Sequence, residues 1–233
     1  MRDYVIINGV SSLNKTGLAI KTLPSITKPL MRAYKEEIDG RNGDLITELG
    51  YAAYDKQLEI GLFGNFDINN IISFFNTSGT ITFSNETDKY YYFQIINQID
   101  YEKLLKFKTA VISLHCQPFK YKVNESPITL TSGDNTITNN GNIYSKPIIT
   151  IVGSGTITIS LGGNQIFSID MSNNSKIVID TANLEAYDPD TGDLLNRIVT
   201  GDYELFKIES GSNTLNISGT ITTASITKYQ RWL

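Results

Sequence analysis

The chain of 233 residues is long enough for one large or two modest domains, and its apolar content of 40% is sufficient to bury a core. The formal net charge of −4 argues against nucleic acid as a partner, because phosphate binding requires a basic surface. The single cysteine, Cys116, excludes an intramolecular disulfide. The N-terminus lacks a signal-peptide core, and no run of about 18 apolar residues occurs, so we expect cytoplasmic synthesis without membrane insertion.

The first half of the chain predicts strands and one helix. The helix is expected over residues 67–77, where Asp67 is a suitable N-cap, apolar residues recur at helical spacing and Gly79 follows as a C-terminal cap. The segment 107–116 alternates polar and apolar residues, which predicts a strand with one buried face. The strands expected in this half cover residues 3–8, 18–23, 28–38, 56–63, 79–84, 89–99 and 107–116.

A domain boundary is predicted near residue 123, where charge and texture both change. Residues 1–123 carry a net charge of +1 and residues 124–233 a net charge of −5, which together give −4. Two prolines bracket the segment 118–127, and proline disfavours helix and sets extended geometry. We therefore expect this segment to be a hinge between two domains, residues 1–123 and 124–233.

The second half of the chain predicts a β-sandwich or barrel. Its most regular stretch, 147-PIITIVGSGTITISLGG-163, alternates threonine with isoleucine, and we expect tight turns at Gly153–Gly155 and at Gly162–Asn164. Related S-G-T-I-T pieces begin at Ser78 and Ser218, but their irregular intervals favour a reused turn over a repeat. The expected strands cover residues 127–131, 147–152, 155–161, 164–170, 175–180, 203–208, 213–218 and 221–227.

Cysteine and histidine offer little chemistry in this chain. His115 and Cys116 are adjacent on a predicted strand, so their side chains point to opposite faces and cannot form a nucleophile pair. A zinc site usually requires several cysteine or histidine ligands. The loop 188-DPDTGD-193 opens like a calcium loop, but Val199 stands where the distal glutamate would be, and a plain turn is favoured over calcium binding. No cofactor is expected.

Acidic pairs and aromatic residues are equally weak candidates for a site. Glu36 with Glu37, or Asp202 with Glu204, could serve glycoside hydrolysis, but nothing around them distinguishes an acid from a base. The run 90-YYYFQ-94 could stack on sugars or bases, but an alternating strand places such residues half in the core and half on the surface. No catalytic or metal-binding residues are assigned, and we do not expect an enzyme.

The order of segments resembles the distal tail proteins (Dit) of siphophages, the baseplate hubs of long non-contractile tails. The resemblance covers essentially the whole chain and rests on joint occurrence, since no single motif is specific. The segments that carry it are 28-KPLMRAYKEEIDGRNGDL-45, Tyr54-Asp55, the predicted helix 67–77, 79-GTITFSNETDKYYYF-93, 113-SLHCQPFKY-121, 146-KPIITIVGSGTITISLGG-163, 201-GDYELFKIESGSNTLNISG-219 and the aromatic and arginine ending 229–233.

The resemblance implies a mainly β fold with two domains. Residues 1–123 would be a β-sandwich-like domain with one helix and a hairpin arm, and residues 124–233 a galectin-like β-sandwich. It also implies a homohexameric ring in the distal tail of a virion, made in the host bacterial cytoplasm. The ring would lie between the tail-tube protein and the tail-associated adhesin or lysin, and its outer sandwiches would hold receptor-binding proteins. The carbohydrate-binding insertions of longer members have no counterpart here.

One hairpin is the candidate subunit interface. The segment 36-EEIDGRNGDL-45 predicts a charged strand-turn-strand unit with two glycines at its bend, suited to reach a neighbouring subunit. Folding back on its own domain is the alternative. The candidate interface residues are Glu36, Glu37, Asp39, Gly40, Arg41, Asn42, Gly43 and Asp44.

Two other function classes remain open alongside the tail scaffold. A carbohydrate-binding adhesin that recognises host cell-wall saccharide would use the galectin-like half, but it needs an aromatic platform, and the only tryptophan is Trp232. A hydrolase would need a recognisable acid, base or nucleophile. We favour the scaffold over the adhesin, and the adhesin over the hydrolase.

Overall fold

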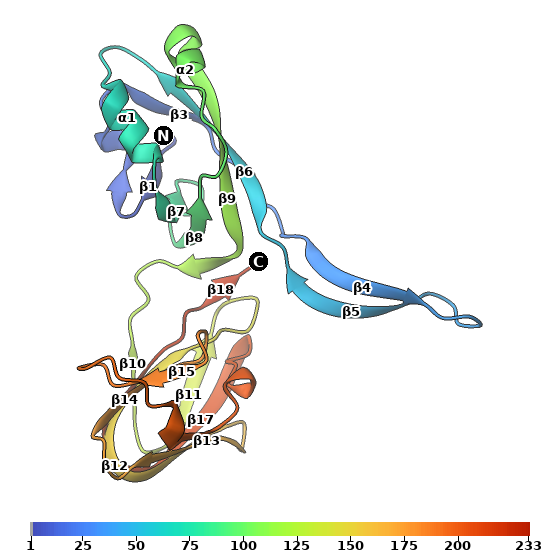
Figure 1. Ribbon diagram of the computed structural model, residues 1–233, viewed down its shortest axis with the longest axis vertical. Helices are drawn as coiled ribbons and strands as arrows, with labels where there is room; N and C mark the ends of the chain where they lie inside the picture. The colour runs from blue at the N-terminus through green and yellow to red at the C-terminus, as the bar shows by residue number, and fades with distance from the viewer. Residues whose placement is uncertain (1) are drawn as a thin grey trace. The chain divides into compact units, whose positions relative to one another are not determined.

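The computed structural model describes residues 2–233, which form two compact units: residues 2–123 together with Leu233, and Asn124–Trp232 (Figure 1). Each unit has its own sheet and its own buried apolar cluster. The chain is mainly β, as the sequence predicted. None of the helices in the described part of the chain is long and apolar enough to cross a bilayer.

The first unit is built on one antiparallel sheet, with the strand order β2-β1-β7-β8-β9-β6-β3. One face of this sheet packs around a buried apolar core to which both α-helices contribute. The elements of this unit are β1 (Val5–Ile7), β2 (Val10–Ser11), η1 (Ser12–Asn14), β3 (Leu18–Thr22), β4 (Met31–Glu37), β5 (Asp44–Tyr51), β6 (Tyr54–Leu62), α1 (Ile68–Phe75), β7 (Ser78–Phe83), β8 (Lys89–Gln94), α2 (Tyr101–Phe107) and β9 (Thr109–Lys122).

The predicted helix is confirmed, but its predicted end is wrong and a second helix exists. Asp67 caps α1, because its side chain accepts a hydrogen bond from the backbone N–H of Asn70. The helix ends at Phe75 with Asn76 as its C-cap, whereas Gly79 lies inside β7 at a φ of +133°. The helix α2 lies after the segment predicted as strand 89–99 and ends at Phe107, the first residue of the segment predicted as strand 107–116, with Asp100 as its N-cap and Leu104 buried.

The strand β9 is longer than predicted, because it runs past the proline expected to begin the hinge. Its buried positions alternate as the sequence indicated, with Ala110, Ile112, Leu114 and Cys116 all inside. Pro118 is accommodated at a shift of register, between the pairs Phe93↔Cys116 and Tyr91↔Lys120. Proline has no N–H to donate and is tolerated at such irregularities, so it did not end the strand.

The strands β4 and β5 form a two-stranded sheet of their own, which we call the arm (Met31–Tyr51). Figure 1 shows them as a long hairpin joined at its tip by residues 38–43. Nearly all of its residues are exposed. The predicted strand-turn-strand hairpin is therefore present, and the second strand extends to Tyr51.

The second unit is a β-sandwich, as predicted. Its strands pair in the order β10-β17-β12-β13-β16, with β11 beside β17, β14 beside β12, and β15 beside β14. The elements of this unit are β10 (Ile128–Leu130), β11 (Gly133–Asn139), β12 (Ile148–Leu161), β13 (Asn164–Met171), β14 (Lys176–Asp180), β15 (Glu185–Tyr187), η2 (Asn196–Ile198), β16 (Val199–Gly201), η3 (Tyr203–Leu205), β17 (Gly211–Thr227) and β18 (Arg231–Trp232).

The turn predicted at Gly162–Asn164 joins β12 to β13, but the turn predicted at Gly153–Gly155 and the break predicted between residues 218 and 221 are bends within continuous strands. The segments 147–152 and 155–161 form the single strand β12, and 213–218 with 221–227 form β17. Near the bend the pairing between β12 and β17 shifts register, and the chain continues without reversing direction. A Cβ on Gly153 would lie 2.5 Å from the Thr220 carbonyl oxygen, so only glycine permits this approach.

The bend closes the sandwich. The first part of β12 pairs with β14, and the second part pairs with β13, while β17 accompanies β12 on both sides of the bend. Residues from both parts, such as Ile151 and Ile159, belong to one buried cluster. Two of the three S-G-T pieces are thus positions where a strand changes direction, with Gly155 at a φ of +70° and Gly219 at +122°, whereas Ser78 begins β7.

Residues 203–208, predicted as a strand, instead begin with the short 3₁₀ helix η3. Asp202 stabilises its start by accepting a hydrogen bond from the backbone N–H of Glu204. Phe206, immediately after it, is fully buried and packs against Phe167 with ring centroids 5.6 Å apart. Phe206 and Ile208 are both buried and two positions apart, which is the spacing of the buried face of a strand. This spacing explains why a strand was wrongly predicted here.

Candidate functional site

The residues with reactive side chains do not form a nucleophile pair. Cys116 is fully buried, and burial raises the pKa of its thiol to about 12. His115 is on the opposite face of β9, where its Nδ1 lies 2.8 Å from Asp55 Oδ1. The alternation of the strand thus separates the two side chains, as expected. The histidine is held by a carboxylate of the neighbouring strand β6.

The acidic loop 188–193 is a turn closed by its own hydrogen bonds. The backbone N–H of Gly192 donates to the Asp188 carbonyl oxygen at 2.8 Å, and the N–H of Asp190 donates to the Asp188 carboxylate. The Asp190 carboxylate pairs with Lys176 Nζ at 2.9 Å. No three His, Cys, Asp or Glu side chains within residues 2–233 are grouped to hold a metal ion.

A charged network is buried in the first unit. Lys120 Nζ lies 3.0 Å from Glu86 Oε1, and both side chains are largely shielded from water. Tyr91 donates a hydrogen bond to the same carboxylate at 3.4 Å. Nearby, Lys56 donates to the Ser25 carbonyl oxygen, and burial lowers the pKa of its ammonium group. Every charge in this network has a partner, which is the arrangement that makes burial of charge tolerable.

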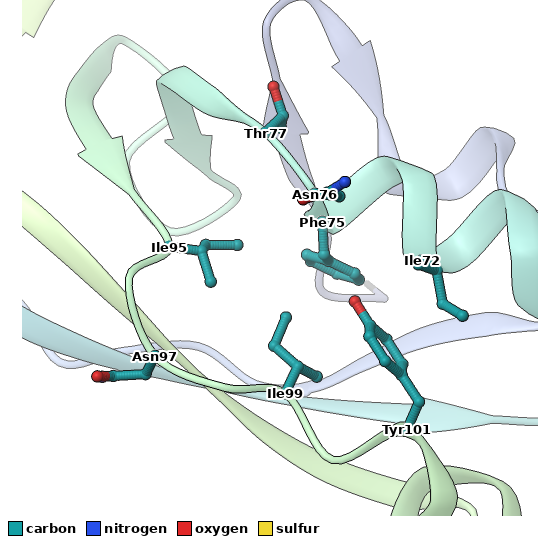
Figure 2. Close-up of a pocket in the computed structure, with 8 residues that line it drawn as sticks. All are labelled: Ile72, Phe75, Asn76, Thr77, Ile95, Asn97, Ile99 and Tyr101. Atoms are coloured by element: carbon teal, nitrogen blue, oxygen red, sulfur yellow. The ribbon is translucent and has the colours of Figure 1, made fainter.

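A cavity of about 300 Å³ lies between the end of α1 and the segment leading to α2 (Figure 2). Figure 2 shows Ile95, Ile99 and Tyr101 facing Phe75, while Asn97 points away from them. Burial raises the pKa of the Tyr101 hydroxyl above its ordinary value. None of the described residues that line the cavity carries a charge, so the cavity offers no acid–base pair. Its residues are Ile72, Phe75, Asn76, Thr77, Ile95, Asn97, Ile99 and Tyr101.

The aromatic run on β8 is divided between core and surface, as the alternation predicted. Tyr91 is buried, whereas Tyr90 and Tyr92 lie on the other face with ring centroids 5.5 Å apart. Tyr121 of β9 packs against both rings at 5.6 and 5.2 Å. The polar face of this strand is thus occupied by tyrosines that pack on one another.

The predicted interface residues all lie at the tip of the arm. Glu36 and Glu37 end β4, Asp44 begins β5, and the turn between them holds the remaining five residues. Gly40 and Gly43 have φ values of +80° and +81°, a conformation that glycine adopts without strain. Within residues 2–233 the Arg41 guanidinium has no ion-pair partner, although its backbone N–H donates to the Ile38 carbonyl oxygen.

The arm carries both charge and apolar surface. Glu36 pairs across the strands with Leu45, and Lys35 pairs with Ile46. Glu36 and Glu37 consequently point to opposite faces and do not form a catalytic pair. Five large apolar side chains of the arm are about half exposed: Tyr34 59%, Ile38 43%, Leu45 40%, Ile46 54% and Leu49 56%.

An apolar surface of this kind has no counterpart in the sequence prediction, which noted only the charges of the hairpin. The signal was present, because Leu45, Ile46 and Leu49 fall on a strand without the strict alternation that one buried face would require. Two-stranded hairpins are only marginally stable alone in water. The arm therefore exposes apolar surface that its own two-stranded sheet does not cover.

The chain has the fold of a phage baseplate hub protein. It is similar to the Dit protein of phage SPP1, described as a paradigm of the hub adsorption apparatus in phages that infect Gram-positive bacteria, with a TM-score of 0.74, 16% identity and 100% of both chains covered. This likeness confirms, at the level of fold, the resemblance seen in the sequence.

Other comparisons add no support. Two structures of the phage P2 baseplate in its activated conformation, with Ca and with Sr, cover 97% of this chain and 97% and 96% of theirs at 12% identity, with TM-scores of 0.47 and 0.45. These scores are too low to support any conclusion. No family model and no curated sequence matches the chain.

Proposed function

We propose that this protein is a structural hub at the distal end of a non-contractile phage tail. In this role it assembles as a homohexameric ring that joins the tail-tube protein to the tail-associated adhesin or lysin. The observation that supports the proposal is the likeness to a hub protein over the full length of both chains. The role is structural, in keeping with side chains that pair with one another instead of converging on a reactive centre.

The two domains have different tasks in this proposal. Residues 1–123 form the ring, and residues 124–233, the galectin-like sandwich, dock receptor-binding proteins. The separate cores of the two units support this division, because a domain with its own core can keep its shape while its neighbour engages another partner.

The arm is the proposed contact between neighbouring subunits. Arg41 stands at its tip without an ion-pair partner among residues 2–233, and a carboxylate on the next subunit would accept charge-assisted hydrogen bonds from it. The acidic residues around it, Glu36, Glu37, Asp39 and Asp44, restrict which surfaces can receive the tip. Gly40, Asn42 and Gly43 give the tip its tight shape.

The test is the mass of the purified protein, measured by light scattering over a range of concentrations. We expect six times the mass of one chain, or an equilibrium between one and six chains, with rings visible by electron microscopy. Arg41→Glu should weaken assembly. The matched control is Arg197→Glu, which makes the same charge change at an exposed site of the second unit.

A chain that stays monomeric at high concentration, both alone and mixed with its tail partners, would refute the ring. A ring that tolerates Arg41→Glu as well as Arg197→Glu would keep the hub but remove the role of the arm tip.

A further inference from the structure

The chain contains three Asn-Gly pairs, and the structure treats them differently. These pairs are the sites where an asparagine side chain is most easily attacked by its own backbone, because glycine leaves the following N–H unhindered and the backbone adaptable. They are Asn8-Gly9, Asn42-Gly43 and Asn140-Gly141. Each pair has an exposed asparagine, so exposure alone does not distinguish them.

Two of the pairs are held by hydrogen bonds. The Asn8 side chain donates to the Ser78 carbonyl oxygen at 2.9 Å and to Thr77 Oγ1 at 3.2 Å, and its Oδ1 accepts from the Thr80 N–H at 2.9 Å. In Asn140-Gly141, the glycine N–H that would attack the asparagine side chain is already hydrogen-bonded. The N–H of Gly141, a buried residue, donates to Asn139 Oδ1 at 2.9 Å.

The pair Asn42-Gly43 is the one that the fold leaves unrestrained. Both residues are exposed at the tip of the arm, between the end of β4 and the start of β5. Within residues 2–233 the Asn42 amide has no hydrogen-bond partner, and no backbone acceptor holds the Gly43 N–H. Exposed loop tips are where chemical modification and proteolysis concentrate.

We propose that Asn42 is a site of spontaneous deamidation. The deprotonated backbone nitrogen of Gly43 attacks Asn42 Cγ, a C–N bond forms, and the amide nitrogen leaves as ammonia. Water then adds to either carbonyl of the five-membered imide and breaks one C–N bond, which gives aspartate or isoaspartate. The net reaction consumes one water and releases one ammonia, and no oxidant or cofactor takes part.

The product changes the charge of the candidate interface. Over residues 36–45 the four carboxylates and one arginine give −3, and a carboxylate at position 42 makes it −4. The isoaspartate form also inserts an additional backbone atom next to Gly43, whose φ is +81°. Deamidation therefore alters both the charge and the shape of the arm tip. This inference concerns the isolated chain and does not rest on the proposed function.

The experiment follows all three pairs in one molecule. The folded full-length protein is incubated at mildly alkaline pH in ¹⁸O-labelled water, at a concentration where light scattering shows single chains. It is then digested, and each peptide is followed by mass spectrometry for the gain of about 1 Da plus label that accompanies conversion of an amide to a carboxylate. Each hydrogen bond is worth about 1 kcal/mol, which corresponds to about fivefold in rate. The three hydrogen bonds at Asn8 should therefore slow deamidation of Asn8 roughly a hundredfold relative to Asn42.

Controls separate the fold from the local sequence. In concentrated urea the three rates should converge, because the hydrogen bonds that protect Asn8 and Asn140 are lost. Asn42→Gln should remove the early mass change from the intact protein. Reaction at Asn42 no faster than at Asn8 or Asn140 in the folded protein would overturn the proposal. So would an undiminished lead of Asn42 in urea, since the fold would then not be the cause.

Discussion

Three apolar residues of the arm, Leu45, Ile46 and Leu49, allow assembly to be separated from folding. We consider the triple replacement Leu45→Thr, Ile46→Thr and Leu49→Thr, which places a β-branched residue with high strand propensity at each position. Each side chain is about half exposed, so the folded monomer gains little from them. The free energy of unfolding of the monomer should change by less than about 0.5 kcal/mol, as is usual for surface substitutions.

The expected effect on assembly is much larger. Complete burial of a leucine or isoleucine side chain is worth about 1.5–3 kcal/mol, so covering the exposed half of each one contributes about 1 kcal/mol. Three such residues give about 3 kcal/mol for each arm, which weakens each subunit contact by roughly a hundredfold. Sedimentation velocity should show the dissociation at concentrations where the unmodified protein is assembled.

A matched control uses exposed apolar residues away from the arm. Ile128→Thr, Leu194→Thr and Leu205→Thr remove one isoleucine and two leucines from the second unit, where these residues are also exposed. This variant should assemble like the unmodified protein. Equal assembly of the arm variant and the control, with both chains folded by circular dichroism, would show that the apolar surface of the arm does not contact another subunit.

Three further predictions concern stability, modularity and reactivity. Glu86→Gln leaves the buried Lys120 ammonium without its counter-charge and should lower the free energy of unfolding in urea by about 3 kcal/mol. Adding Lys120→Met should recover part of this loss, and additive effects of the two substitutions would contradict a coupled pair. Residues 124–233 expressed alone should unfold cooperatively, and a non-cooperative transition would mean that the two halves share a core. In calorimetry the same fragment should bind host cell-wall polysaccharide no more tightly than millimolar, and micromolar binding would favour the adhesin. Because its pKa is raised to about 12, Cys116 should resist a thiol reagent at pH 8 in the folded protein and react fully in urea; rapid native reaction would contradict its burial.

Local patterns predicted the elements that depend on local physics. The alternation along β9 identified its buried face, and the Asp67 cap identified the start of α1. The helix α2 was missed because seven residues carry too little periodicity, and its stability comes from the burial of Leu104. Its cap, Asp100, was the one local signal available.

The bends of β12 and β17 could not be derived from their own residues. A glycine with positive φ serves a tight turn and a strand bend equally well, and the choice depends on which strand lies alongside. Gly219 is constrained by the Thr156 carbonyl oxygen, 2.6 Å from where its Cβ would be. That neighbour is about sixty residues away in sequence, beyond any local window.

The arm tip was located correctly from sequence, but the character of the arm was only partly foreseen. Charges and glycines around Arg41 marked a hairpin because turn chemistry is local. Whether that hairpin has a core of its own depends on tertiary packing, which the pattern of Leu45 and Ile46 leaves undecided.

The pairing of β12 with β17 also sets the order in which the chain becomes structured during synthesis. Leu161 pairs with Leu215 and Ile148 with Thr227, so each contact closes a loop of roughly fifty to eighty residues. Non-local pairing of this kind forms slowly, and domains fold as units from the N-terminus during translation. The helices and strands of the first unit end at Lys122, so most of this unit can fold while the second is still being translated. The sandwich cannot close until β17 has left the ribosome, and a ribosome that stalls before Gly211 leaves a folded first domain joined to an open second one.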